Sequence, residues 1–296
     1  MKKSIISFSA MLMYLSTPAQ QAKHLEAGPV QVANTGFYEN KGQLTDQNYK
    51  PNPNVKYLLC SPGFNVQLRQ TGFSYDTYTE KVDNSCQVVS ENMKLPEGKK
   101  PPVPLIRHYH RVDIELLNSN PNATLVAEGK SEAYYNYFTS GTPQGGVSYV
   151  HSYQKVTYKN IYPNIDLVFG TQKDANSDND TPSPNGEGRD GVNGAEYSFV
   201  VHPGGKVADI KLQYKGENKI TLADNKLVVN VNAGNFSETI PDSYLLNPLS
   251  GGQTQSPFRG LGLIGVRGAS VQVNYTALGN NTFGFVSSAL RSPLSL

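Results

Sequence analysis

The chain has 296 residues, with 26 basic and 24 acidic side chains, and 38% of its residues are hydrophobic. This length allows one large domain or two of ordinary size, each with a substantial core. A chain this close to neutrality lacks the strongly basic surface of nucleic-acid-binding proteins, so we expect no nucleic-acid partner.

The first residues follow the order of charged, apolar and small residues that is typical of a secretory signal peptide. Two lysines precede an apolar run at 5–15, and small residues follow as far as Ala19. The run is shorter than the roughly 20 residues that a helix needs to cross a bilayer. We therefore predict a signal peptide at 1–19 that is cleaved between Ala19 and Gln20, then a linker at 20–33, with no transmembrane span in the mature chain.

Such a leader predicts an extracellular or cell-surface location, with the periplasm as the alternative. Removing it takes two lysines away and leaves basic and acidic side chains equal in number. Export also makes a disulfide feasible between Cys60 and Cys86, the two cysteines of the chain. The equally weighted alternative is a buried thiol at Cys60, with Cys86 in a polar loop. The sequence cannot choose between them, because it does not give the separation of the two residues.

Apolar and polar side chains alternate over most of the chain, as in strands with one buried face. Residues 55–59, 64–68 and 73–78 predict an antiparallel meander with short turns between the strands. Further strands are predicted at 112–116, 123–127, 134–138, 147–158, 165–169, 197–201, 210–214, 227–231 and 271–275.

These strands predict an all-β fold, an antiparallel β-sandwich-like architecture made of two packed β subdomains at 34–140 and 141–296. Two polar segments interrupt the pattern, at 84–104 and 174–194. We expect both to be exposed loops, and the second to be disordered, because their composition cannot build a core.

Several segments carry a resemblance to a known family, in the order in which that family has them. They read FYENKGQ at 37–43, NYF at 136–138, YKNIYPNIDLVF at 158–169 and EYSFVVHPG at 196–204. They resemble the uncharacterised module at the N-terminus of bacterial proteins with SBBP-type β-propeller repeats, common in Bacteroidetes. The similarity runs from about Phe37 to the end, and an ordered series of segments is more specific than any single motif.

The resemblance implies an exported protein in which the module precedes repeats, adhesive Ig-like domains or a sorting domain, and it supplies no activity. The chain departs from the family at 174–194, where a short hairpin is usual. It also stops at 292–296, about where repeats would begin, so a truncated gene is one interpretation.

Three patterns suggest ligand sites and have simpler interpretations. The glycines of 260–265 have dinucleotide-binding spacing, but no strand precedes them and no helix follows, which favours a glycine-rich turn. His108 and His110 would share one face of a strand and could hold a metal with a third ligand such as His151. A half-exposed strand with two polar rings is the favoured interpretation. The alternating acidic and amide residues of 174–180 lack the glycine and glutamate of an EF-hand, which favours a solvated loop over a weak calcium site.

Catalytic motifs are absent from the sequence: it has no nucleophile elbow, no phosphate-binding loop and no zinc-protease helix motif. Asp113 with Glu115, or Asp166 with Glu196, could in principle serve as acid and base for sugar hydrolysis, although solvated carboxylates are commoner. The densest tyrosine group offers a surface for stacking on a sugar or docking a partner, unless these rings replace tryptophan in the core. It consists of Tyr134, Tyr135 and Tyr137.

The sequence thus predicts an exported, non-catalytic module that acts through protein contacts in a structural or adhesive role. We predict no catalytic residue, no cofactor and no metal, and we expect other surface proteins or adjacent repeat domains as partners. The alternative is a secreted carbohydrate-binding or carbohydrate-active protein with a glycan ligand.

Overall fold

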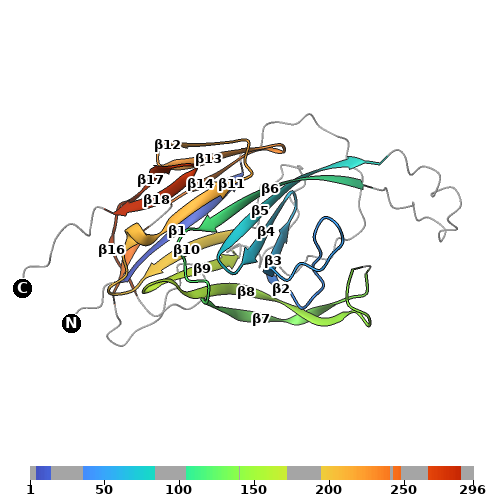
Figure 1. Ribbon diagram of the computed structural model, residues 1–296. Helices are drawn as coiled ribbons and strands as arrows, with labels where there is room; N and C mark the ends of the chain where they lie inside the picture. The colour runs from blue at the N-terminus through green and yellow to red at the C-terminus, as the bar shows by residue number, and fades with distance from the viewer. Residues whose placement is uncertain are drawn as a thin grey trace, which may run out of the picture.

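The computed structural model describes residues 5–14, 36–83, 105–139, 141–171, 195–240, 243–247 and 266–287 (Figure 1). These residues form eighteen strands and one short 3-10 turn, and no helix among them has the length and apolar content of a membrane span. The strands are β1 Ile5–Tyr14, β2 Phe37–Glu39, β3 Val55–Ser61, β4 Phe64–Arg69, β5 Gly72–Val82, β6 Leu105–Leu116, β7 Thr124–Tyr137, β8 Val147–Tyr162, β9 Ile165–Thr171, β10 Ala195–Val201, β11 Lys211–Lys215, β12 Lys219–Ala223, β13 Lys226–Val231, β14 Gly234–Thr239, β15 Ser243–Asn247, β16 Val266–Ser270, β17 Val273–Gly279 and β18 Thr282–Ser287; the turn is η2 Val207–Asp209.

Alternation of side chains produces the predicted meander of β3, β4 and β5. In β4, Phe64, Val66 and Leu68 are buried, and the residues between them are half-buried on the other face. Gly63 turns the chain between β3 and β4 with a φ of +75°, a conformation that a residue without Cβ adopts at little cost. The strand pattern of the sequence therefore sets both faces of this sheet.

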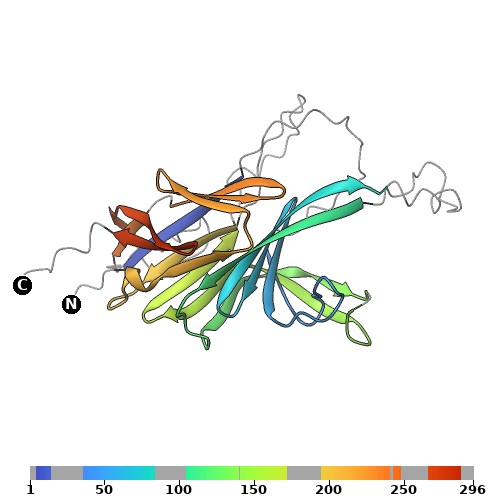
Figure 2. The ribbon, with the colours of Figure 1, turned by 45° about the horizontal axis from the view of Figure 1, so that its top comes forward.

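The strands join into one antiparallel sheet that curls back on itself (Figures 1 and 2). One edge of β8 pairs with β7, and the other edge pairs with both β2 and β9. From β2 the sheet continues through β3, β4, β5, β6, β11, β18 and β17. From β9 it continues through β10, β1, β14, β13 and β12, and β15 with β16 adds to β1. The curl brings these two series face to face.

Aromatic rings join the two series across the core. The ring centroid of Phe73 lies 5.1 Å from that of Phe169 and 5.3 Å from that of Tyr197. Phe64 lies 5.8 Å from Phe236 in the same way. Each such pair adds about 0.5–1.5 kcal/mol to the stabilisation from buried area.

Tyrosine takes the place of tryptophan, which the chain lacks, among the largest fully buried side chains. These tyrosines are Tyr75, Tyr158, Tyr162 and Tyr214. Buried hydroxyls need partners, and Tyr158, for example, donates a hydrogen bond of 2.7 Å to the carbonyl of Arg69.

The predicted all-β, antiparallel sandwich is confirmed. Strands from 34–140 pair with strands from 141–296 at β2–β8, β7–β8 and β6–β11. Residues of both segments also pack in one hydrophobic cluster. The two predicted subdomains therefore meet in a shared core.

Two segments differ in detail from the sequence-based expectation. The strands predicted at 123–127 and 134–138 form one long strand, β7, whose register shifts between Lys130 and Tyr134. The apolar run assigned to the leader lies in the sheet as β1, and residues 6–10 within it alternate with a period of two. The predicted linker at 20–33 and the predicted loops at 84–104 and 174–194 lie outside the described residues.

A carboxyl group lies among the core tyrosines. Glu238 of β14 is fully buried, and it accepts hydrogen bonds of 2.7 Å from the Tyr197 hydroxyl and 2.9 Å from the Tyr214 hydroxyl. Burial disfavours the charged form and raises the pKa of Glu238 to about 7, although the tyrosine hydrogen bonds partly oppose this shift.

This raised pKa predicts a pH-dependent stability. In the unfolded chain, Glu238 ionises near its ordinary pKa of 4.5. In the folded chain, it stays protonated to about pH 7. Its contribution is therefore complete below about pH 4.5 and is lost as pH rises to about 7, a loss on the order of 3 kcal/mol. Glu238→Gln should flatten this part of the curve of unfolding free energy against pH, measured with urea.

The matched control is Glu132→Gln, because Glu132 is exposed on β7. It should leave the curve unchanged. A Glu238→Gln curve parallel to that of the natural chain would contradict the protonation of Glu238 in the folded state.

Candidate binding surface

Two of the three histidines considered as metal ligands, His110 and His151, contact the backbone, whereas His108 is exposed on β6. The ring of His110 contacts the Gly216 carbonyl through Nε2 at 2.7 Å and accepts a hydrogen bond of 3.1 Å from the Asn232 amide at Nδ1. Both ring nitrogens are thus occupied, which fixes the neutral tautomer with its proton on Nε2. His151 contacts the Ser131 carbonyl through Nδ1 at 2.9 Å. Within the described ranges, no three His, Cys, Asp or Glu side chains form a metal-binding group.

Cys60 retains exposed surface on β3. The protein around its sulfur nevertheless raises the pKa of the thiol, which disfavours the reactive thiolate. Cys86, Ala19 and Gln20 lie outside the described residues, so the disulfide and the cleavage site stay predictions. The glycines of 260–265 and the acidic run of 174–180 also lie outside the described residues.

Neither predicted carboxylate pair has the arrangement of an acid and a base. Asp113 and Glu115 both form ion pairs with Arg69, at 3.5 Å and 3.3 Å. Asp166 accepts from Lys159 at 2.9 Å and contacts His202 at 3.1 Å, and although burial opposes it, these contacts lower the pKa of Asp166 to about 2. Glu196 stands opposite Gly170, which is four residues from Asp166 along β9. The two carboxylates are therefore separated by about 13 Å along the strand.

The outer face of β3–β6 carries a network of charges at its centre. Arg111 donates to Asp113 at 2.8 Å, to Gln67 at 3.0 Å and to Ser74 at 3.0 Å. Despite its burial, the pKa of Asp113 is lowered by the hydrogen bond of 2.6 Å that the Ser74 hydroxyl donates to it, by the Arg111 hydrogen bond and by the positive charge of Arg69. The network therefore holds its carboxylates ionised and its long side chains in fixed positions.

Beyond this network, β5 and β6 continue as a two-stranded ribbon whose residues are exposed on both faces. The face that continues the outer face of the sheet carries three cross-strand pairs, Tyr78 with Tyr109, Glu80 with Arg107 and Val82 with Leu105. We call these six residues the arm face. Figures 1 and 2 show the ribbon extending past the rest of the sheet.

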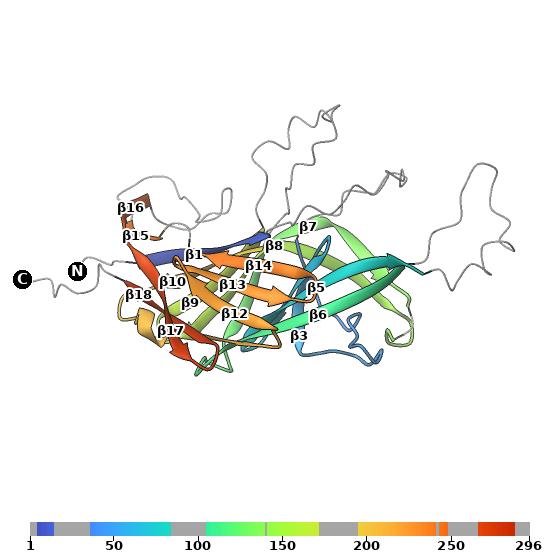
Figure 3. The same ribbon diagram turned by 90° about the horizontal axis from the view of Figure 1, so that it is seen from above.

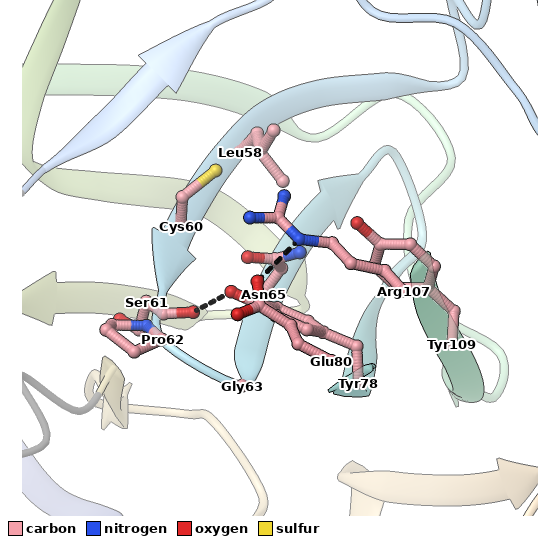
Figure 4. A pocket seen from close by; sticks show the side chains of 10 residues that line it. All are labelled: Leu58, Cys60, Ser61, Pro62, Gly63, Asn65, Tyr78, Glu80, Arg107 and Tyr109. Atoms are coloured by element: carbon pink, nitrogen blue, oxygen red, sulfur yellow. Dashed lines mark hydrogen bonds and ion pairs between the residues drawn. The ribbon is translucent and has the colours of Figure 1, made fainter. Parts of the chain in front are cut away.

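The arm face borders a hollow of about 760 Å³ (Figure 4). Arg107 donates to Glu80 at 2.8 Å, and its guanidinium lies 5.0 Å from the centre of the Tyr78 ring. The Tyr78 hydroxyl donates to the Ser61 carbonyl at 3.3 Å. Strands β3 to β6 all supply lining residues: Leu58, Cys60, Ser61, Pro62, Gly63, Asn65, Tyr78, Glu80, Arg107 and Tyr109.

The tyrosine group of β7 places exposed rings on both faces of the sheet. Tyr135 packs edge-on against Tyr38 of β2, with ring centroids 5.4 Å apart. Tyr134 lies 4.7 Å from Tyr149 and 5.8 Å from His151. Both Tyr134 and Tyr135 are exposed, so these rings pair on the surface of β7 and β8 and do not enter the core.

The sequence analysis did not identify the arm face. Its residues come from two segments separated by 22 positions, 83–104, and only the β5–β6 register brings them together. The available signal was alternation, because Tyr78, Glu80 and Val82 share one face of a strand, as do Leu105, Arg107 and Tyr109.

The charge network predicts unequal effects of two arginine substitutions. Arg69 is only 20% exposed and also donates to the Phe73 carbonyl, so Arg69→Ala leaves partly buried partners unsatisfied. It should lower the free energy of unfolding by about 1–3 kcal/mol. Arg107→Ala, at an exposed pair, should cost less than about 1 kcal/mol. Urea unfolding measures both, and equal losses would contradict a structural role for Arg69.

The comparisons with known proteins give a family without a described activity. Residues 37–180 and 187–259 match the family described as a domain of unknown function, DUF7948. The first matched segment spans β2 to β9 and therefore includes all six residues of the arm face. No curated protein and no solved structure matches the chain. Because the match covers well over half of its residues, the chain belongs to the DUF7948 family.

Proposed function

We propose that this protein is an exported, non-catalytic module of the cell surface or extracellular space that binds a partner protein through the arm face. The observation that carries the proposal is the exposure of apolar side chains on a ribbon that extends beyond the core. Val82, Leu105 and Tyr109 are 53%, 50% and 54% exposed. Contiguous apolar surface of this kind, rimmed by charges, is typical of interaction sites.

The composition of the arm face also suits a protein partner. Tyrosine and arginine are, with tryptophan, the residues most enriched among those that dominate binding energy at protein interfaces. Here Arg107 is oriented by Glu80 and stacked on Tyr78, so it loses little side-chain entropy when it contacts a partner. The adjacent hollow offers a place for a projecting side chain of that partner.

Export and the family setting complete the proposal. The N-terminal residues have the pattern of a signal peptide, and the resemblance to modules that precede SBBP-type repeats in Bacteroidetes suggests adjacent repeats or other surface proteins as partners. Engaged carboxylates at Asp113 and Asp166 support a role in binding over catalysis. The periplasm is the alternative location.

A second candidate function is carbohydrate binding. The hollow combines two tyrosine rings with Asn65, Glu80 and Arg107, which is the mixture of stacking and hydrogen-bonding groups that suits a sugar. The exposed ring of Tyr135 would extend such a site to a longer glycan, because it packs against Tyr38, the cross-strand partner of Leu58 in the lining of the hollow.

Substitution on the arm face separates the two candidates. The double variant Leu105→Ser with Tyr109→Ser should reduce binding of the purified protein to cells of its source at least about tenfold, since two interface contacts are lost. Its unfolding temperature should barely change, because both side chains are exposed. Leu278→Ser is the control, because Leu278 is equally exposed on β17, away from the ribbon.

A photo-crosslinker at position 105 should then capture a protein. Saturable binding on a glycan array, or turnover in a hydrolase panel, that the double variant abolishes would instead favour the carbohydrate candidate. Cell binding that the double variant and Leu278→Ser reduce equally would contradict the arm face as the binding surface.

The export component has its own test. Edman sequencing or intact mass of the protein in the native host should give a chain that starts at Gln20 in the extracellular or surface fraction. A chain that retains its first residues in the cytosolic fraction would refute export without bearing on the arm face.

A further inference from the structure

The first part of β8 extends beyond the strand that covers its continuation. Strand β9 pairs with β8 only from Lys155 onward, whereas β8 begins at Val147. Among the described strands, only β7 and β2 pair with β8 before Lys155. Figures 1 and 3 show β7 and β8 reaching past β9.

The register of β2 places two tyrosines of this region on the face that also carries the core. Phe37 of β2 lies in the core and stands opposite Tyr153 of β8. Two residues along β2, Glu39 stands opposite Tyr57 of β3. Cross-strand partners share a face of the sheet, and so do residues two apart on one strand. Tyr57 and Tyr153, whose ring centroids are 6.0 Å apart, therefore lie on the inner face of the sheet.

Aromatic rings continue along this face to the exposed end of β8. His151 is two residues from Tyr153 and stands opposite Tyr134 of β7. The centroid of the Tyr134 ring lies 5.8 Å from that of His151 and 4.7 Å from that of Tyr149. Tyr57 and Tyr153 are half-buried, whereas Tyr134 and Tyr149 are 47% and 59% exposed. We call these five rings the inner stripe: Tyr57, Tyr153, His151, Tyr134 and Tyr149.

Tyr149 combines a strained backbone with an exposed ring. Its φ of +57° lies in the left-handed region, which a bulky side chain rarely adopts. The Asn136 side chain accepts a hydrogen bond of 3.0 Å from the Tyr149 amide, and the Lys41 ammonium donates to the Ser148 carbonyl at 3.1 Å. Because the ring stays exposed, burial does not offset this strain. Strained residues that are held by surrounding contacts are concentrated at functional sites.

The polar groups of the inner stripe suit a ligand rich in hydroxyl groups. His151 donates from Nδ1 to the Ser131 carbonyl, which leaves Nε2 of the neutral ring as an acceptor. The Glu39 carboxylate accepts from the Tyr153 hydroxyl at 3.5 Å and from the His151 amide at 3.4 Å, and it has lone pairs for further donors. The tyrosine hydroxyls of the inner stripe can both donate and accept.

Charge and composition distinguish the inner stripe from the arm face. Lys130 stands opposite Tyr153 and so shares the face of Glu39, and these two charges balance each other. The balance favours an uncharged ligand over a strongly acidic or basic one. The rings of the inner stripe all have polar tips, whereas the arm face presents the aliphatic side chains of Val82 and Leu105. Flat rings with hydrogen-bonding tips suit the faces and hydroxyls of sugars.

We propose that the inner stripe binds an extended, uncharged oligosaccharide, whose sugar rings stack along β8 on Tyr149, Tyr134 and Tyr153. Its hydroxyls donate to Glu39 and to Nε2 of His151. This site lies on the opposite face of the sheet from the arm face and its hollow. It therefore goes beyond the proposed function and does not depend on it.

The experiment is affinity gel electrophoresis of the full chain with xylan, laminarin or hydroxyethylcellulose in the gel, together with an array of neutral oligosaccharides. At least one of these probes should retard or bind the natural chain. The double variant Tyr134→Ala with Tyr149→Ala should weaken that binding at least about tenfold, because two stacking rings are lost. Its unfolding temperature should barely change, because both rings are exposed.

Two variants serve as controls. Tyr135→Ala removes a ring of similar exposure from the opposite face of β7 and should leave sugar binding unchanged. Tyr149→Gly removes one ring and relaxes the positive φ, so binding should fall while the unfolding temperature stays the same or rises.

Binding of none of the neutral probes, or binding of polygalacturonate alone, would overturn the proposal. Equal losses in Tyr135→Ala and in the Tyr134 and Tyr149 double variant would also overturn it. If only Leu105→Ser with Tyr109→Ser abolished sugar binding, the sugar would occupy the hollow and not the inner stripe. The inner-stripe double variant should still capture a protein through the arm face, so failure of one proposal is distinguishable from failure of the other.

Discussion

Contact between aromatic rings of the two facing series of strands is the interaction on which this structure depends. Phe73 of β5 meets Phe169 of β9 and Tyr197 of β10, and Phe64 of β4 meets Phe236 of β14. A sheet buries its apolar face only against a second layer, and here the curl of the sheet supplies that layer by bringing its two series of strands face to face. Each strand segment that reaches past this contact region lacks a partner layer.

This constraint explains where the candidate surfaces lie. Residues 72–77 of β5 are buried in the core region, whereas residues 79–82 continue into the ribbon and are exposed. The ribbon keeps its shape through its own pairing with β6 and through the Glu80–Arg107 ion pair. At its base, Arg69 and Arg111 fix the carboxylates of the sheet. The side chains of this surface are therefore held in fixed positions although they are exposed, and such a surface suits binding.

Much of the fold follows from alternation in the sequence. Where apolar residues occupy every second position, as in 64–68 or 112–116, the strand and its buried face agree with prediction. Residues 5–14 carry the pattern of a leader and form strand β1 in the structure, since a short run of apolar and small residues satisfies the requirements of both. The sequence predicts two strands where the structure has the single strand β7. The alternation breaks near Gly129, which has a φ of +69°, and the register shifts just after it.

The candidate surface could be predicted only in part. Tyr134, Tyr135 and Tyr137 were recognised because they are close in sequence. The arm face was missed, since it depends on the register that places Arg107 opposite Glu80 and Tyr109 opposite Tyr78. Glu238 was missed for a related reason: its burial follows from the meeting of β14 with β10 and β11, three segments whose contact no local pattern reveals.

The most direct test of this account is hydrogen exchange of the exported protein, with and without the partner captured at the arm face. We predict slow exchange for residues 64–77 and for β9 in both states. Residues 79–82 and 105–109 should exchange fast in the isolated protein and slowly with the partner bound. Unchanged exchange in these two segments on partner binding would contradict the claim that the ribbon beyond the core is the binding surface.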